Sequence, residues 1–101
     1  MTTTTTTPKF QLGLIIATVG ATEAFANTGQ TPLPFLKRHL SGDWGDLCDE
    51  DRLLNEQALI DGSRLLSAYR LADGTKIWCI TEACGENGQR EATTFLLPSE
   101  Y

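Results

Sequence analysis

The order of hydrophobic and polar positions along the chain predicts a strand, three helices and then three more strands. Residues 10–19 are rich in β-branched and aliphatic side chains, and Gly13 in their midst disfavours a helix, so this stretch predicts a strand. Three helical segments follow, each with a glycine just beyond its end. They span residues 21–27, 32–40 and 49–61.

The ends and faces of these helices follow from residue type. Small polar residues favour the N-cap position, and proline suits the first turn after such a cap. The predicted N-caps are Thr22, Thr31 and Asp49. The side chains expected to face the core are Leu33, Leu36 and Leu40 in the second helix and Leu53, Leu54 and Ala58 in the third.

In the last third of the chain the pattern changes from helical segments to segments typical of β-strands. SRLLSAYRL and TKIWCITEA flank Ala72-Asp73-Gly74, which predicts a hairpin. The three-residue loop gives two sets of neighbours, with Leu66, Ala68, Trp78 and Ile80 on one face and Leu65, Tyr69, Ile77 and Cys79 on the other. After a polar loop, ATTFLLP predicts a final strand that ends at Pro98.

The element order β-α-α-α-β-β-β keeps the helices and most of the strands in separate runs. Such an order is typical of an α+β fold, here an antiparallel sheet of about four strands with two to three helices packed on one face. We expect a single domain over residues 9–101. The threonine-rich residues 1–8 are of low complexity and predict a disordered tail.

The stretch KFQLGLIIATVGATEAFAN, residues 9–27, has a second interpretation. One lysine, an apolar run and Ala24-Phe25-Ala26 also outline a secretory signal peptide. Glu23 beside the cleavage motif, a threonine run in place of a basic lead-in, and the 75 residues that cleavage would leave all argue against it. We therefore expect residues 9–27 to belong to the domain, with secretion as the alternative.

The amino-acid composition indicates the cellular compartment and the kind of partner. Three cysteines, Cys48, Cys79 and Cys84, do not form an even disulfide framework, which favours reduced thiols in the cytoplasm. No apolar run reaches the ~18–20 residues of a membrane span. Eight basic and 13 acidic residues give a net charge of −5, so direct nucleic-acid binding is not expected. A basic protein surface, or a nucleic-acid-binding protein, is a better-matched partner.

The strongest local concentration of charge is an acidic cluster that runs from the connector into the third helix. Its spacing does not match a calcium loop, and first-turn carboxylates are explained by the helix dipole. Asp43 and Asp46 are not so explained. The candidate partner-binding residues are Asp43, Trp44, Asp46, Asp49, Glu50, Asp51 and Glu56. Trp44 in the GDWG loop either anchors an interface or folds back into the core.

Other chemistry has weak support in the sequence. His39 with the three cysteines has none of the compact spacings of a zinc site. With a single histidine in the chain, Cys48 with His39 is the only candidate nucleophile–base pair, and His39 is already explained, with Arg38, as a cation at a helix C-terminus. We therefore expect no metal, no cofactor and no enzymatic activity, and Arg38 and His39 are candidates for a structural motif.

Four segments of the chain together resemble a known family of proteins. RHLSGDWGDL, DEDRLLNEQAL, GSRLLSAYRLADGTKIWCITEA and TTFLLPSEY resemble a family of small bacterial proteins carried on plasmids and other mobile elements. Members are labelled plasmid-related or uncharacterised, and some are mislabelled as a type I restriction enzyme subunit M. The matching residues are Arg38, His39, Gly42, Asp43, Trp44, Gly45, Asp51, Asn55, Ser67, Tyr69, Trp78, Thr81, Glu82 and Tyr101. The resemblance covers most of residues 10–101 and implies mobile-element biology, but no biochemical activity. CGENGQRE is longer than is usual there.

Three functions follow as hypotheses. The first is a non-enzymatic acidic protein from a mobile element that inhibits or modulates a host defence complex, such as a CRISPR or restriction complex, by protein–protein contact. The second is a plasmid-maintenance or regulatory accessory protein that forms a homodimer through exposed sheet edges. The third is a small metal-binding or hydrolytic enzyme.

Overall fold

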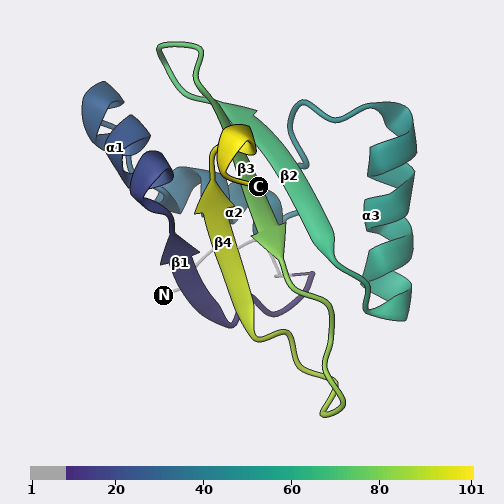
Figure 1. Cartoon of the computed structure of the whole chain (residues 1–101). Coiled ribbons are helices and arrows are strands. Elements are labelled where there is room, and N and C mark those ends of the chain that lie inside the picture. The colour runs from purple at the N-terminus through teal and green to yellow at the C-terminus, as the bar shows by residue number, and fades with distance from the viewer. Residues whose placement is uncertain (1–8) are drawn as a thin grey trace, which may run out of the picture.

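The computed structural model describes residues 9–101, so the tail predicted for residues 1–8 lies outside the described residues. The chain forms an α+β fold in the expected order (Figure 1). The elements are β1 (Leu14–Ala17), α1 (Val19–Thr28), α2 (Leu33–Leu40), α3 (Asp49–Asp61), β2 (Leu65–Arg70), β3 (Lys76–Thr81), β4 (Ala92–Leu96) and the short 3₁₀ helix η1 (Pro98–Glu100).

The four strands form one mixed sheet in the order β1-β4-β3-β2. β2, β3 and β4 are antiparallel neighbours, as predicted, and the two faces of the hairpin are those expected from its loop. β1 differs, because it pairs in parallel with β4, with Leu14 opposite Ala92 and Ala17 opposite Phe95. The sheet is therefore not wholly antiparallel, since the chain returns to the β1 side only after three helices and a three-stranded meander.

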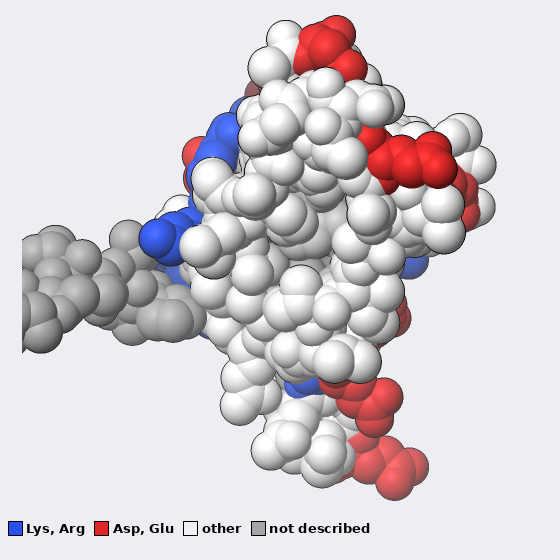
Figure 2. Space-filling model, turned by 90° about the vertical axis from the view of Figure 1, so that its left-hand side faces the viewer, with Lys and Arg blue, Asp and Glu red and all other residues white. Residues whose placement is uncertain are grey.

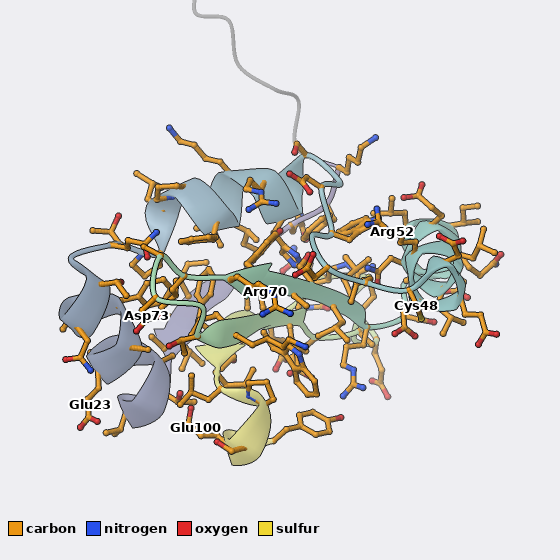
Figure 3. The ribbon with its side chains drawn as sticks, turned by 90° about the horizontal axis from the view of Figure 1, so that it is seen from above. Glu23, Cys48, Arg52, Arg70, Asp73 and Glu100 are labelled. Atoms are coloured by element: carbon orange, nitrogen blue, oxygen red, sulfur yellow. The ribbon has the colours of Figure 1, made fainter. Side chains whose placement is uncertain are left out.

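Two helices cover one face of the sheet and bury its main core. α2 lies across this face, and α1 lies at its β1 end (Figures 1 and 3). The helices contribute Phe25 and Phe35, whose rings lie 5.9 Å apart, and the sheet contributes Phe95, with its ring 5.7 Å from Phe25. The remaining buried members of this core are Ala21, Ala24, Tyr69, Leu71, Ile77 and Cys79.

The third helix is placed differently from the first two. α3 stands beside the outer edge of β2 rather than over the face of the sheet (Figure 1). Its buried residues are Asn55 and Ala58, whereas Leu53 and Leu54 are 69% and 66% exposed. The prediction that Leu53 and Leu54 face inward was therefore wrong. Asn55 occupies the inward position because its amide satisfies the backbone of the β2 edge.

Local details of the helices also differ from the sequence prediction. The N-caps of α1 and α3 are Thr18 and Cys48, not Thr22 and Asp49, and no side chain caps α2. The Thr18 hydroxyl accepts a hydrogen bond from the Ala21 N–H at 3.2 Å. In α2 the buried residues are Phe35 and His39, while Leu33 is 56% exposed. The first strand is also shorter than predicted at both ends: it begins at Leu14 and ends at Ala17, shortly before α1 begins at Val19.

The C-terminal segment crosses the far face of the sheet and ties it to the N-terminal elements. The Glu100 carboxylate accepts hydrogen bonds from the Thr18 hydroxyl at 2.5 Å and the Gly20 N–H at 3.0 Å. Tyr101 packs edge-on against Trp78, which is half-buried on this face. Residues 9–27, including the apolar run that outlined a signal peptide, are therefore integrated with the last residues of the domain.

Candidate functional site: the GDWG connector and the acidic helix

Glycines fix the path of the connector, residues 41–48, between α2 and α3. Gly45 has a φ of +73° and forms an isolated bridge with Ala68 of β2. A Cβ atom added at Gly45 would lie 2.0 Å from the Ala68 carbonyl oxygen, so only glycine fits this approach. The Ala68 N–H donates to the Trp44 carbonyl at 3.0 Å, and the Asp46 N–H donates to the Ala68 carbonyl at 2.7 Å. The connector thus pairs with the edge of β2.

Trp44 is part of the core and does not provide an exposed anchor. Its side chain is 3% exposed and packs near the rings of Phe10 and His39, whose centroids lie 6.2 and 5.7 Å away. The indole Nε1 donates to Glu56 Oε2 at 2.9 Å, which satisfies the one polar atom of the ring. The hypothesis that Trp44 contacts a partner directly is therefore wrong. Trp44 instead joins the connector to α3.

Asp43 and Asp46 are each paired with an arginine. Asp43 Oδ2 lies 2.8 Å from Arg38 Nε, and Asp46 Oδ2 lies 2.8 Å from Arg70 Nε. The hydrogen bond from Arg38 lowers the pKa of Asp43 below its usual value. These side chains, with Tyr69, line a surface hollow of about 350 Å³. Because each carboxylate faces a guanidinium, this surface carries no excess of negative charge.

A chain of buried hydrogen bonds lies beneath the connector. His39 Nε2 bonds the Thr81 hydroxyl at 2.8 Å, and His39 Nδ1 bonds the Ser67 hydroxyl. Thr81 also bonds the Thr93 hydroxyl at 2.8 Å, so the network links α2 to all three antiparallel strands. Burial, with a smaller effect of the Arg90 charge, lowers the pKa of His39 to about 4. The imidazole is therefore neutral at pH 7.

The partner of His39 in this network is Ser67, not Cys48, so the expectation that Cys48 and His39 form the only nucleophile–base pair was wrong. Ser67 and His39 are both fully buried, and neither lines the surface hollow beside Asp43 and Tyr69. A nucleophile must reach a substrate, so the geometry favours a structural role for the pair. No sequence signal relates the two residues, because they are 28 positions apart on different elements.

The remaining candidate residues gather on α3. Its 13 residues include the carboxylates of Asp49, Glu50, Asp51, Glu56 and Asp61 and one cation, Arg52. Five negative charges and one positive charge give α3 a net charge of −4, out of −5 for the whole chain. Arg52 is turned toward the connector, where it donates to the carbonyls of Gly45 and Leu47 at 2.8 and 3.1 Å (Figure 3). The outer surface of α3 is therefore acidic.

The same outer surface also carries apolar side chains. Leu53, Leu54 and Ile60 are 69%, 66% and 82% exposed. Leu53 and Ile60 lie seven positions apart, about two helical turns, so they share one side of the helix, and Leu54 lies next to them in the sequence. The surface of α3 therefore combines exposed aliphatic groups with carboxylates. The apolar members were missed because the sequence pattern was assigned to the core.

The three cysteines differ in their exposure. Cys79 is buried, whereas Cys48 and Cys84 are exposed and unpaired within residues 9–101. In that same range, no three His, Cys, Asp or Glu side chains come together as a metal site.

Arg90 is a buried cation that no sequence pattern indicated. It is 6% exposed, and its guanidinium donates to the carbonyls of Ala58 and Ser63 at 3.1 and 2.6 Å. It joins the 84–91 loop to the end of α3.

Comparison with known proteins adds no further constraint. No protein-family model matches the chain, and neither a curated protein nor a solved structure matches it. Among the described residues, no helix has both the length and the apolarity needed to cross a membrane. The candidate site is therefore assigned from its geometry and charge alone.

Proposed function

We propose that this protein is a non-enzymatic binding protein that presents α3 to a basic surface of another protein. One observation carries the proposal: α3 has a net charge of −4, in a chain whose net charge is −5, and exposes Leu53, Leu54 and Ile60 beside its carboxylates. An amphipathic helix recognises a groove through side chains three to four positions apart, and aliphatic anchors supply the buried area. Carboxylates around those anchors select a basic groove and speed association.

The proposed target is a host defence complex, such as a CRISPR or restriction complex, in the cytoplasm. Such complexes bind nucleic acid through basic channels, which match an acidic helix. The resemblance to mobile-element proteins supports this class of target, and the three free thiols support a reducing compartment. Direct mimicry of a DNA backbone would require a longer acidic surface than α3 provides. We therefore propose contact with the protein lining of the channel.

A second candidate function, a homo-oligomeric regulatory or plasmid-maintenance protein, is favoured by a different observation. The β1 edge of the sheet has no neighbouring strand within the described residues, and its side chains are exposed and apolar. This candidate does not require a foreign partner. It predicts a change of mass with concentration and no affinity for defence complexes.

The first test is an affinity pull-down of the tagged full-length protein from a host lysate, with three matched variants. Leu53→Ala combined with Ile60→Ala removes apolar area from α3, and Asp49→Asn combined with Glu50→Gln removes two of its charges. The control, Glu23→Gln on α1, removes one exposed carboxylate far from α3 (Figure 3). All of these side chains are exposed, so folding should be preserved.

The expected result is that the wild type and the control retain a stoichiometric nucleic-acid-binding complex. The apolar variant should lose it, and the charge variant should bind less tightly, with a weaker dependence on salt. Equal retention by all variants would reject α3 as the binding element. Because Asp43 and Asp46 are already paired with arginines, their replacement by asparagine should have a smaller effect than changes on α3.

A further inference from the structure

The two edges of the sheet differ in whether their outward-facing backbone groups have hydrogen-bond partners. At the β2 edge, the Asn55 side chain donates to the Leu66 carbonyl at 2.6 Å and accepts from the Leu66 N–H at 3.1 Å. The next outward-facing residue, Ala68, bonds the backbone of Trp44 and Asp46 in the connector. Each of these outward-facing backbone groups therefore has a partner, so this edge cannot accept another strand.

The β1 edge has no such cover. The N–H groups of Leu14 and Thr18 point inward and donate to the carbonyls of Glu91, which directly precedes β4, and Phe95 at 2.8 and 3.0 Å. Since backbone direction alternates along a strand, the N–H and C=O groups of Ile15 and Ala17 point away from β4. Within residues 9–101, no other segment pairs with β1 on that side. The outward groups are free to accept a strand.

The side chains of this edge are apolar and do not protect the strand from pairing with another chain. Leu14, Ile15 and Ile16 are 67%, 42% and 39% exposed, and Val19, which follows the strand, is 76% exposed. Figure 2 shows this side of the molecule, where uncharged atoms cover the centre and charged groups lie toward the margins. Exposed edge strands usually carry a charge, a proline or a covering segment, because an uncovered edge pairs with other chains. Residues 10–22 contain neither a charge nor a proline.

We propose that the β1 edge pairs with the β1 edge of a second copy of this chain to form a two-fold symmetric dimer. In such an interface, each residue near the axis faces its own copy, so a charged strand would repel itself. The absence of charge over residues 10–22 makes this edge self-complementary. A second copy therefore fits better than a charged peptide segment.

The alternation of the backbone limits the register to axes that pass through a residue, and we place the axis at Ile16, near the centre of β1. Outward-facing Ile15 and Ala17 must pair with outward-facing residues, so an antiparallel two-fold axis passes through a residue and not through a peptide bond. An axis at Ile16 pairs Ile15 with Ala17 of the second copy on both sides, with about four backbone hydrogen bonds. It also brings the two Ile16 side chains together across a narrow, non-hydrogen-bonded site. The two sheets then join into one, with the α3 helices at its opposite ends.

The test is analytical ultracentrifugation of the full-length chain from about 5 to about 500 µM, since a four-residue strand gives a small interface of modest affinity. The mass should rise from 11.1 kDa toward about twice that value. Ile16→Lys should hold the protein at the monomer mass throughout this range. The control, Leu33→Lys on α2, introduces the same charge at another exposed aliphatic side chain outside β1 and should dimerise like the wild type.

Cross-linking tests the register separately. In a background with Cys48 and Cys84 replaced by serine, Ile16→Cys should form an intermolecular disulfide on mild oxidation, because the two sites face each other across the axis. Leu14→Cys should not, since the two copies of residue 14 would lie four residues apart along the paired strands. A monomeric wild type, an Ile16→Lys variant that still dimerises, or equal cross-linking of both cysteine variants would overturn the proposal.

Discussion

Lowering the pH should destabilise the fold through His39 before most carboxylates titrate. The imidazole is fully buried between the hydroxyls of Ser67 and Thr81, and the charge of Arg90 opposes its protonation. Its pKa is lowered to about 4, from 6.5 for an unperturbed histidine. Between these two values the unfolded chain binds a proton that the folded chain does not. Stability should therefore fall as the pH falls below about 6.5, and this effect should level off below about 4.

The size of the effect follows from the two pKa values. One pKa unit corresponds to about 1.4 kcal/mol, so the complete loss is about 3 kcal/mol, and about 2 kcal/mol is already lost at pH 5. For a domain of this size, a loss of about 2 kcal/mol lowers the melting temperature by about 10 °C. The chain has one histidine, so a histidine effect on stability between pH 7 and pH 5 is assigned to His39.

Two measurements check this prediction. Urea unfolding at pH 7 and pH 5 should show the loss in the wild type, and His39→Gln, which cannot titrate, should show much less dependence on pH although it is less stable overall. Nuclear magnetic resonance should show the single imidazole remaining neutral in the folded protein at pH 5. An imidazole that titrates between pH 6 and pH 7 in the folded state would refute the reasoning.

Three further effects are expected from the same contacts. Asn55→Ala should lower the free energy of unfolding by about 2 kcal/mol, measured by urea denaturation, because it leaves two backbone groups of the β2 edge unsatisfied. Gly45→Ala should cost about 2–3 kcal/mol, since its Cβ meets a carbonyl oxygen, whereas Gly74→Ala, equally left-handed but open to solvent, should cost about 1 kcal/mol by the same assay. In a thiol-reagent assay at pH 8, two cysteines should react in the folded protein. Cys79 should react only on unfolding, because burial raises the pKa of its thiol.

The parts of the fold that depend on local pattern could be predicted from the sequence. The β2–β3 hairpin has strand-forming segments on both sides of a turn ending in Gly74, and both its existence and its faces were confirmed. The α+β class and the element order follow from the same local signals. The acidic first turn of α3 was also confirmed, although the cap itself is Cys48.

The parts that depend on distant hydrogen bonds could not be predicted. A leucine pair is more hydrophobic than an asparagine, so Leu53 and Leu54 were assigned to the core in preference to Asn55. The polar side chain is buried only because a strand edge, distant in sequence, offers it both a donor and an acceptor. The same reason explains why the pairing of His39 with Ser67 was not foreseen. Burial of Trp44 was one of two alternatives, and the bond to Glu56 favours it.

The parallel pairing of the first and last strands has a consequence for how the chain folds during synthesis. The Glu100 contact with Thr18 joins residues 82 positions apart, and β1 has no neighbour in the sheet until β4 exists. At a synthesis rate of ~5–20 residues per second, β4 follows β1 by roughly 4–16 s. For that time the apolar β1 segment is exposed without its strand partner, as in other slowly closing, non-local topologies. The nascent chain is thus expected to need chaperone protection of its first strand until its last residues are made.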